Sequence, residues 1–189
     1  MILFTAALVS YALLFISDIA DKKYGRKGLL APTLFILGSL GIIVSFSRLL
    51  FSSSFMGALH ISPGAILFFL IFLSLLLYTL FPALTHGDTS TVERGKLPLV
   101  STGVYALCRH PGVLWMAGCC ICLYIICPTA EMGILAFLVA FFDLVYVWWQ
   151  DLFIFPYTIS HYNDYKNSVP FLIPTALSVV RCLNNLRQG

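Results

Sequence analysis

The tripeptide Arg109-His110-Pro111 has the residue types needed to bind an anion at the start of a helix. Pro111 opens an apolar run, and proline suits the first helical turn because its missing N–H would have no partner there. Arg109 and His110 would then lie where free backbone N–H groups and positive charge favour an anion such as a carboxylate. A snorkelling arginine beside an interface histidine is the alternative. We treat both as candidate catalytic residues, and Arg109 also as a candidate substrate ligand.

A second candidate group follows an isolated acid in a later apolar run. Asp143 is the only acidic residue well inside such a run, and Tyr146, Gln150 and Asp151 follow it at offsets of three, seven and eight. This spacing puts the four side chains on one face of a helix. If the run crosses a membrane, that face must line the protein interior or a wet cleft. We take Asp143 as a catalytic candidate and Tyr146 as a substrate ligand; a packing network of hydrogen bonds is the alternative.

The six cysteines do not indicate a metal site. Four of them lie on one apolar run and cannot converge on a tetrahedral ion without ligands from elsewhere. Free cysteine commonly packs as a small apolar residue. The sequence also contains no zinc H-E-x-x-H motif, no phosphate-binding glycine loop and no G-x-S-x-G elbow. We therefore expect no metal.

The elements that must position these residues are membrane helices. The 189 residues are 60% hydrophobic and only 10% charged, with a mean hydropathy of +0.95. Soluble domains carry about 25% charged residues, so a soluble enzyme is excluded. A net charge of +3 gives no basic face for nucleic acid. The composition predicts an all-α, polytopic membrane helical bundle that forms a single domain, 1–189.

Five apolar runs are long enough to be transmembrane helices, with a C-terminal segment after the last of them. The predicted spans are 1–17, 28–47, 64–84, 111–127 and 132–149. The link between the last two is so short that they must form an antiparallel hairpin. We expect helical pieces at or near the membrane interface in the remaining residues.

The basic residues predict the orientation. Every one except Arg48 falls in the first loop, the third loop or the C-terminal segment, namely Lys22, Lys23, Arg26, Lys27, Arg94, Lys96, Arg109, Lys166, Arg181 and Arg187. With five spans these three segments share one side of the membrane. The positive-inside rule then places the N-terminus outside and both the third loop and the C-terminal segment in the cytosol.

Two runs of the sequence carry a family resemblance. The run LVSTGVYALCRHP, at 99–111, resembles the L-V-x-x-G-x-Y-x-x-x-R-H-P signature of the isoprenylcysteine carboxyl methyltransferase family of small integral membrane enzymes. Downstream, HYNDYK at 161–166 with Val169-Pro170 is similar to the family's E-E-Y-x-E-Y-K-x-x-V-P tail. The two runs flank a helical hairpin, as they do in that family.

The resemblance implies S-adenosyl-L-methionine as cofactor, bound on the cytosolic side by about 88–174. Gly103 is implied to let the loop turn tightly. The positions implied to bind the cofactor are Leu99, Val100, Gly103, Tyr105, His110, Pro111, Gly112, Val113, Gln150, Asp151, Tyr162 and Tyr165.

Two positions depart from the family pattern. Val113 stands where the family usually has tyrosine, and Gln150 replaces the first member of an acidic pair. Asp151 keeps its charge and could meet the cofactor's ammonium or sulfonium group, whereas Gln150 could accept a hydrogen bond from it without providing a charge. These departures leave open a non-catalytic membrane scaffold.

The resemblance implies methyl transfer to a lipophilic acceptor that enters from the bilayer, with an isoprenylcysteine-type carboxylate as the leading choice. Arg109 could orient a carboxylate through paired hydrogen bonds. A phospholipid amine or a thiol is the alternative acceptor, and it would need His110 or Asp143 as a base. A transporter that uses Asp143 is a further alternative, but the outer halves of the spans offer little polar path.

Overall fold

The computed structural model describes residues 2–24, 28–52, 57–83, 87 and 92–188. Parts of the sequence predictions lie outside these ranges, namely residues 1, 84 and 88–91 together with Arg26 and Lys27. In the described ranges the chain is helical, and its one β-type pairing is an isolated bridge between Leu97 and Ile159. The predicted all-α fold is confirmed.

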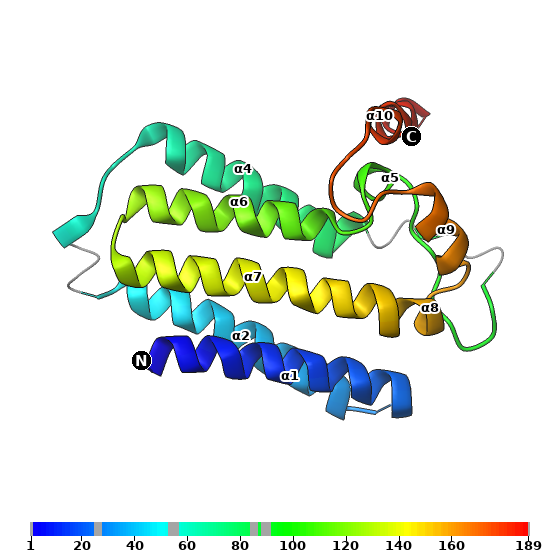
Figure 1. Cartoon of the computed structure of the whole chain (residues 1–189), viewed down its shortest axis with the longest axis horizontal. Helices are drawn as coiled ribbons and strands as arrows, with labels where there is room; N and C mark the ends of the chain where they lie inside the picture. Colours follow the sequence, from blue (N-terminus) through cyan, green and yellow to red (C-terminus); the bar gives the residue numbers. More distant parts are fainter. Residues whose placement is uncertain (1, 25–27, 53–56, 84–86, 88–91, 189) are drawn as a thin grey trace. The chain divides into compact units, whose positions relative to one another are not determined.

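The helices follow the apolar runs of the sequence (Figure 1). They are α1 (Ile2–Tyr24), α2 (Leu30–Leu50), α4 (Pro63–Leu80), α5 (Val104–Leu107), α6 (Pro111–Ile126), α7 (Ala130–Phe153), α8 (Phe155–Thr158), α9 (Tyr162–Ser168) and α10 (Ala176–Gln188).

Four helices, α1, α2, α4 and α7, are long and apolar enough to cross a membrane. This agrees with a multi-pass integral membrane protein. The remaining predicted span, 111–127, is also a helix, α6, but it has only 16 residues. At 1.5 Å per residue it is about 24 Å long, against a hydrocarbon core of about 30 Å. Five spans are therefore not confirmed by helix length.

Three helices continue past the predicted ends of their spans. α1 runs on to Tyr24, α2 to Leu50 and α7 to Phe153. Charged side chains end the stretch that can be immersed in hydrocarbon, but they do not end a helix, because aspartate and lysine inside a helix cost little free energy. Hydropathy therefore does not predict where these helices end.

The chain divides into two compact units, each of which we consider by itself. The first unit comprises Met1–Leu70 and Ala117–Trp149, and the second comprises Ile71–Met116 and Gln150–Gly189. Both runs that carry the family resemblance lie in the second unit.

Small residues allow α1 and α2 to pack closely in the first unit. A Cβ atom added at Gly38 of α2 would lie 2.8 Å from the backbone oxygen of Ser10 on α1, and one added at Gly41 would overlap the Ser10 hydroxyl. Nearer the ends of the two helices, Ser17 donates a hydrogen bond to Ala31 O at 2.8 Å. Close backbone approach of this kind is how membrane helices associate, since hydrocarbon provides no hydrophobic driving force between them.

Replacing Gly38 with alanine should destabilise the first unit. The new methyl group would press on the Ser10 carbonyl and on Leu14, 3.0 Å away, so α1 and α2 must separate. We expect a loss of about 1–3 kcal/mol, typical of overpacking, seen as a lower unfolding midpoint in detergent. Gly64→Ala on α4 is the control, because nothing lies within 4 Å of its added Cβ. Equal midpoints for the two variants would contradict the close packing.

Candidate functional site

The Arg-His-Pro run forms a turn between two helices of the second unit. Gly103 precedes α5 with a φ of +58°, a conformation that favours glycine. α5 ends at Leu107, the following Cys108 is extended, and Pro111 begins α6 as predicted. Arg109 and His110 are therefore held between two helices, and both are buried.

The tail is hydrogen-bonded directly to this turn. The N–H of Arg109 donates to Pro170 O at 2.9 Å, and the N–H of His110 donates to Phe171 O at 3.3 Å. On α9, the Tyr165 hydroxyl donates to the backbone oxygen of Tyr105 at 2.6 Å. The two runs that resemble the methyltransferase family, far apart in the sequence, are thus brought together.

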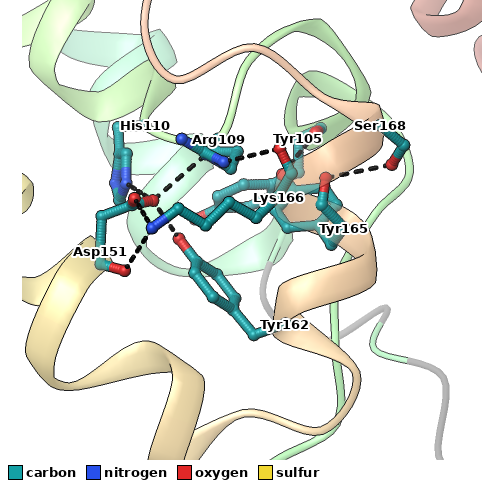
Figure 2. Close-up of polar contacts among 8 residues, drawn as sticks. All are labelled: Tyr105, Arg109, His110, Asp151, Tyr162, Tyr165, Lys166 and Ser168. Carbon is teal, nitrogen blue, oxygen red and sulfur yellow. Dashed lines mark hydrogen bonds and ion pairs between the residues drawn. The ribbon is translucent and has the colours of Figure 1, made fainter.

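The carboxylate of Asp151 lies at the centre of the site (Figure 2). Its Oδ1 accepts a hydrogen bond from the Tyr162 hydroxyl at 2.7 Å and another from His110 Nε2 at 3.2 Å. The same oxygen lies 3.2 Å from Arg109 Nε. Oδ2 lies 2.9 Å from Lys166 Nζ, which also donates to Asp151 O at 3.3 Å. The acid is buried, so the three donors Tyr162, His110 and Lys166, together with the charge of Arg109, replace the water that it loses.

The cluster carries more positive than negative charge. Burial lowers the pKa of His110, although Asp151 opposes the shift, so the imidazole is neutral at neutral pH and donates through Nε2. Arg109 and Lys166 are cations, and Asp151 is the only acid that the structure places among these groups. One positive charge is therefore uncompensated within the cluster.

Arg109 retains binding capacity. Its Nη1 donates to Lys166 O at 2.9 Å, and its guanidinium lies 5.6 Å from the ring centre of Phe171. Nε is close enough to Asp151 for an ion pair, yet its N–H is not directed at any acceptor among the described residues. A buried donor without a hydrogen bond is costly, and an incoming anion could satisfy it.

Aromatic rings enclose the cluster. His110 stacks on Phe155 at 5.8 Å between ring centres and meets Phe171 edge-on at 4.9 Å. Phe155 also contacts Tyr162 at 5.4 Å. Burial raises the pKa values of Tyr162 and Tyr165, so both hydroxyls remain protonated and act as donors.

All twelve residues implied to bind a cofactor lie in the second unit, but several make internal contacts. The Tyr105 hydroxyl donates to Thr79 O at 3.1 Å, and burial raises its pKa to about 12. Leu99 packs on Tyr162 and Tyr165. Val113 is buried, and Asp151 already has three donors and the Arg109 guanidinium around it. The interior of the site is thus occupied by its own side chains.

The other predicted candidates belong to the first unit. Tyr146 is buried and meets Phe15 of α1 edge-on at 5.2 Å, and its hydroxyl hydrogen-bonds to Asp18. Asp143 lies on the same helix, near Tyr11. The predicted catalytic grouping of Asp143 with Arg109 and His110 stays a prediction, because these residues fall in different units.

Sequence reasoning missed Lys166 and the two phenylalanines as site residues. A signal for the lysine was present, since Tyr162 and Lys166 are four residues apart and share one face of α9. Phe155 begins the four-residue helix α8 and Phe171 lies in a bend, and both segments are too short to show a periodicity from which their contacts could be read. Among the described residues, no group of three His, Cys, Asp or Glu side chains could hold a metal ion.

No family model, curated protein or solved structure matches this chain.

Replacing Asp151 with asparagine should strongly destabilise the second unit. The change leaves Arg109 and Lys166 without their counter-charge, and removing one partner of a buried ion pair costs about 3–5 kcal/mol. A much lower unfolding midpoint in detergent is the expected result. Asp164→Asn, on the exposed surface of α9, should leave the midpoint unchanged. A stable Asp151→Asn variant would show that the pairing contributes little.

The stability of the protein should fall as the solution is acidified below 6.5, the ordinary pKa of histidine. The folded pKa of His110 is lowered, so in this range the unfolded chain binds a proton that the folded chain does not. The stability that His110 contributes is therefore present above that pH and is lost as the pH falls towards the pKa of His110 in the folded protein. His110→Gln should flatten the profile between about pH 7 and about pH 5, measured by unfolding midpoints. Superimposable profiles would contradict the shift.

Proposed function

We propose that this chain is an integral membrane methyltransferase that uses S-adenosyl-L-methionine and acts on a lipophilic acceptor. The observation that carries the proposal is the buried, cation-rich cluster formed where the Arg-His-Pro turn meets the tyrosine-bearing tail. Perturbed, buried ionisable groups that converge from separate segments are typical of functional sites.

The residues present fit the amino-acid end of the cofactor. The uncompensated positive charge and the free Nε–H of Arg109 suit a carboxylate. Asp151 suits an ammonium group if one of its present partners is displaced. Lys166, whose side chain is 29% exposed, is the most accessible of these partners. When bound, the cofactor supplies a methyl group already activated on a sulfonium.

The protein's own task is then to orient groups and control a proton. The turn and tail hold Arg109 rigidly by backbone hydrogen bonds, so an acceptor carboxylate could be aligned at low entropic cost. A carboxylate acceptor needs no base. For an amine or thiol acceptor, neutral His110 keeps a lone pair on Nδ1 and is the base candidate in this unit.

We propose that five helices cross the membrane, with the N-terminus outside and the site in the cytosol. The short helix α6 is included because of two contacts, each within one unit. His60 N–H, just before α4, donates to Ile126 O at the end of α6. Trp115 Nε1 near the start of α6 donates to Thr79 Oγ1 near the end of α4 at 3.1 Å. α6 thus matches the length of α4, which is long enough to cross a membrane.

A non-catalytic membrane scaffold is the second candidate. It is favoured by the three donors and the Arg109 charge that already surround Asp151 and by the burial of Val113 at a position where the family has tyrosine. A scaffold would keep the cluster for its contribution to folding alone.

Binding of S-adenosylhomocysteine to the detergent-purified chain distinguishes the two candidates. We expect measurable binding by calorimetry, weakened about tenfold or more in Arg109→Gln, because a hydrogen bond to a charged group contributes about 1.5–3 kcal/mol. Arg94→Gln, an exposed arginine in the same loop, should bind like the parent chain. A folded parent chain that does not bind would refute the methyltransferase proposal and support the scaffold.

The acceptor can be identified from its product. Lipid extract incubated with the chain and methyl-labelled cofactor should yield a labelled lipid by mass spectrometry. A labelled ester would identify a carboxylate acceptor, whereas labelled nitrogen or sulfur would identify the amine or thiol alternative.

A further inference from the structure

The last helix, α10, presents apolar side chains to the outside of the second unit. Leu177, Val180 and Leu183 are 69%, 54% and 53% exposed. Their spacing of three residues puts them on one side of the helix. Ser178 and Cys182, on the other side, are buried. The helix is therefore amphipathic with its apolar side facing away from the protein.

Side-chain hydrogen bonds hold this helix in place. Thr175 caps its start, because Thr175 Oγ1 accepts from Ser178 N at 3.2 Å while Ser178 Oγ accepts from Thr175 N at 2.9 Å. Such reciprocal bonds satisfy backbone donors that a helix N-terminus leaves free. Arg181 Nη1 donates to Ser168 O at the end of α9 at 2.9 Å. The exposed apolar face thus belongs to a fixed element.

The contacts of α10 place it at the level where membrane helices end. α10 packs against α5. Tyr105 of α5 donates to Thr79 O in the last turn of α4, a helix long enough to span. α5 also ends only three residues before the apolar helix α6 begins at Pro111. The end of an apolar spanning helix marks the surface of the bilayer, so a helix packed on α5 lies near lipid headgroups.

The charge of α10 complements such a surface. Its sequence, ALSVVRCLNNLRQ, contains Arg181 and Arg187 and no acidic residue. Basic amphipathic helices lie in the headgroup layer and bind more strongly when that layer contains anionic lipids.

We propose that α10 is an interfacial anchor, with its Leu177, Val180 and Leu183 face inserted into the lipid surface of the membrane that the chain spans. Lipid, rather than a protein partner, is the occupant because the face lies beside the ends of spanning helices and the helix that presents it contains arginine and no acidic residue. Anionic headgroups deepen the insertion. This proposal does not depend on methyltransferase activity.

Spin labels on the full-length chain in lipid nanodiscs test the proposal. Val180→Cys and Leu183→Cys are labelled, and relaxation by oxygen, which partitions into lipid, is compared with relaxation by a water-soluble nickel chelate. Asp164→Cys on α9 is the water-exposed control, and Phe137→Cys on α7, an exposed position in a spanning helix, is the lipid control. The parent chain, whose six cysteines are buried, gives the labelling background.

We expect the labels at 180 and 183 to have oxygen-to-nickel ratios at least twofold above that at 164 and closer to that at 137. Replacing zwitterionic nanodiscs with nanodiscs that contain phosphatidylglycerol should raise the ratios further. Nickel access equal to that at 164 would refute insertion, and labels shielded from both reagents would show that protein covers the face instead. Oxygen-to-nickel ratios that do not change with phosphatidylglycerol would refute the claim that anionic headgroups deepen the insertion.

Discussion

The burial of one carboxylate constrains the whole second unit. Moving an ionised acid out of water is unfavourable by several kcal/mol unless donors replace the lost hydration. Asp151 finds them at His110 in the turn and at Tyr162 and Lys166 on α9, and Arg109 in the turn adds its positive charge. Those donors come from separate segments of the chain, so satisfying the acid requires the tail to fold back onto the turn. The backbone hydrogen bonds from the turn to 170–171 complete that junction.

The same pairing also defines how the site could accept a ligand. Tyr162, His110 and Arg109 are buried and therefore fixed, whereas Lys166 reaches the acid from a partly exposed position. Exchange of the Lys166 ammonium for another ammonium would leave the charge balance at Asp151 unchanged. The released lysine would add its charge to the excess that Arg109 already provides. A zwitterionic ligand meets both requirements at once, and a simple cation or a simple anion meets only one.

The helices could be predicted from the sequence, because apolar runs and the proline at 111 are local signals. The meeting of turn and tail was implied only by the resemblance of these two runs to a family signature. The environment of each polar residue could not be predicted from the sequence. Helical period places Asp143, Tyr146, Gln150 and Asp151 on one face, yet Tyr146 meets α1 while Asp151 meets α9. Lys166 reaches Asp151 because of the register between α9 and α7. That register depends on a loop of irregular backbone at 159–161. Tyr105 was expected to touch a cofactor, but its hydroxyl joins α5 to α4.

The position of the cluster follows from the ends of the apolar helices. Within the second unit, α4 ends beside Tyr105, α6 begins directly after His110, and α7 ends just beyond Asp151. A cluster with excess positive charge cannot lie within hydrocarbon, but at helix ends it can have lipid on one side and water on the other. α10 packs against α5, which precedes the turn, and is hydrogen-bonded to the end of α9 in the tail. Lipid bound by α10 would therefore stabilise the contact between turn and tail on which the pairing of Asp151 depends.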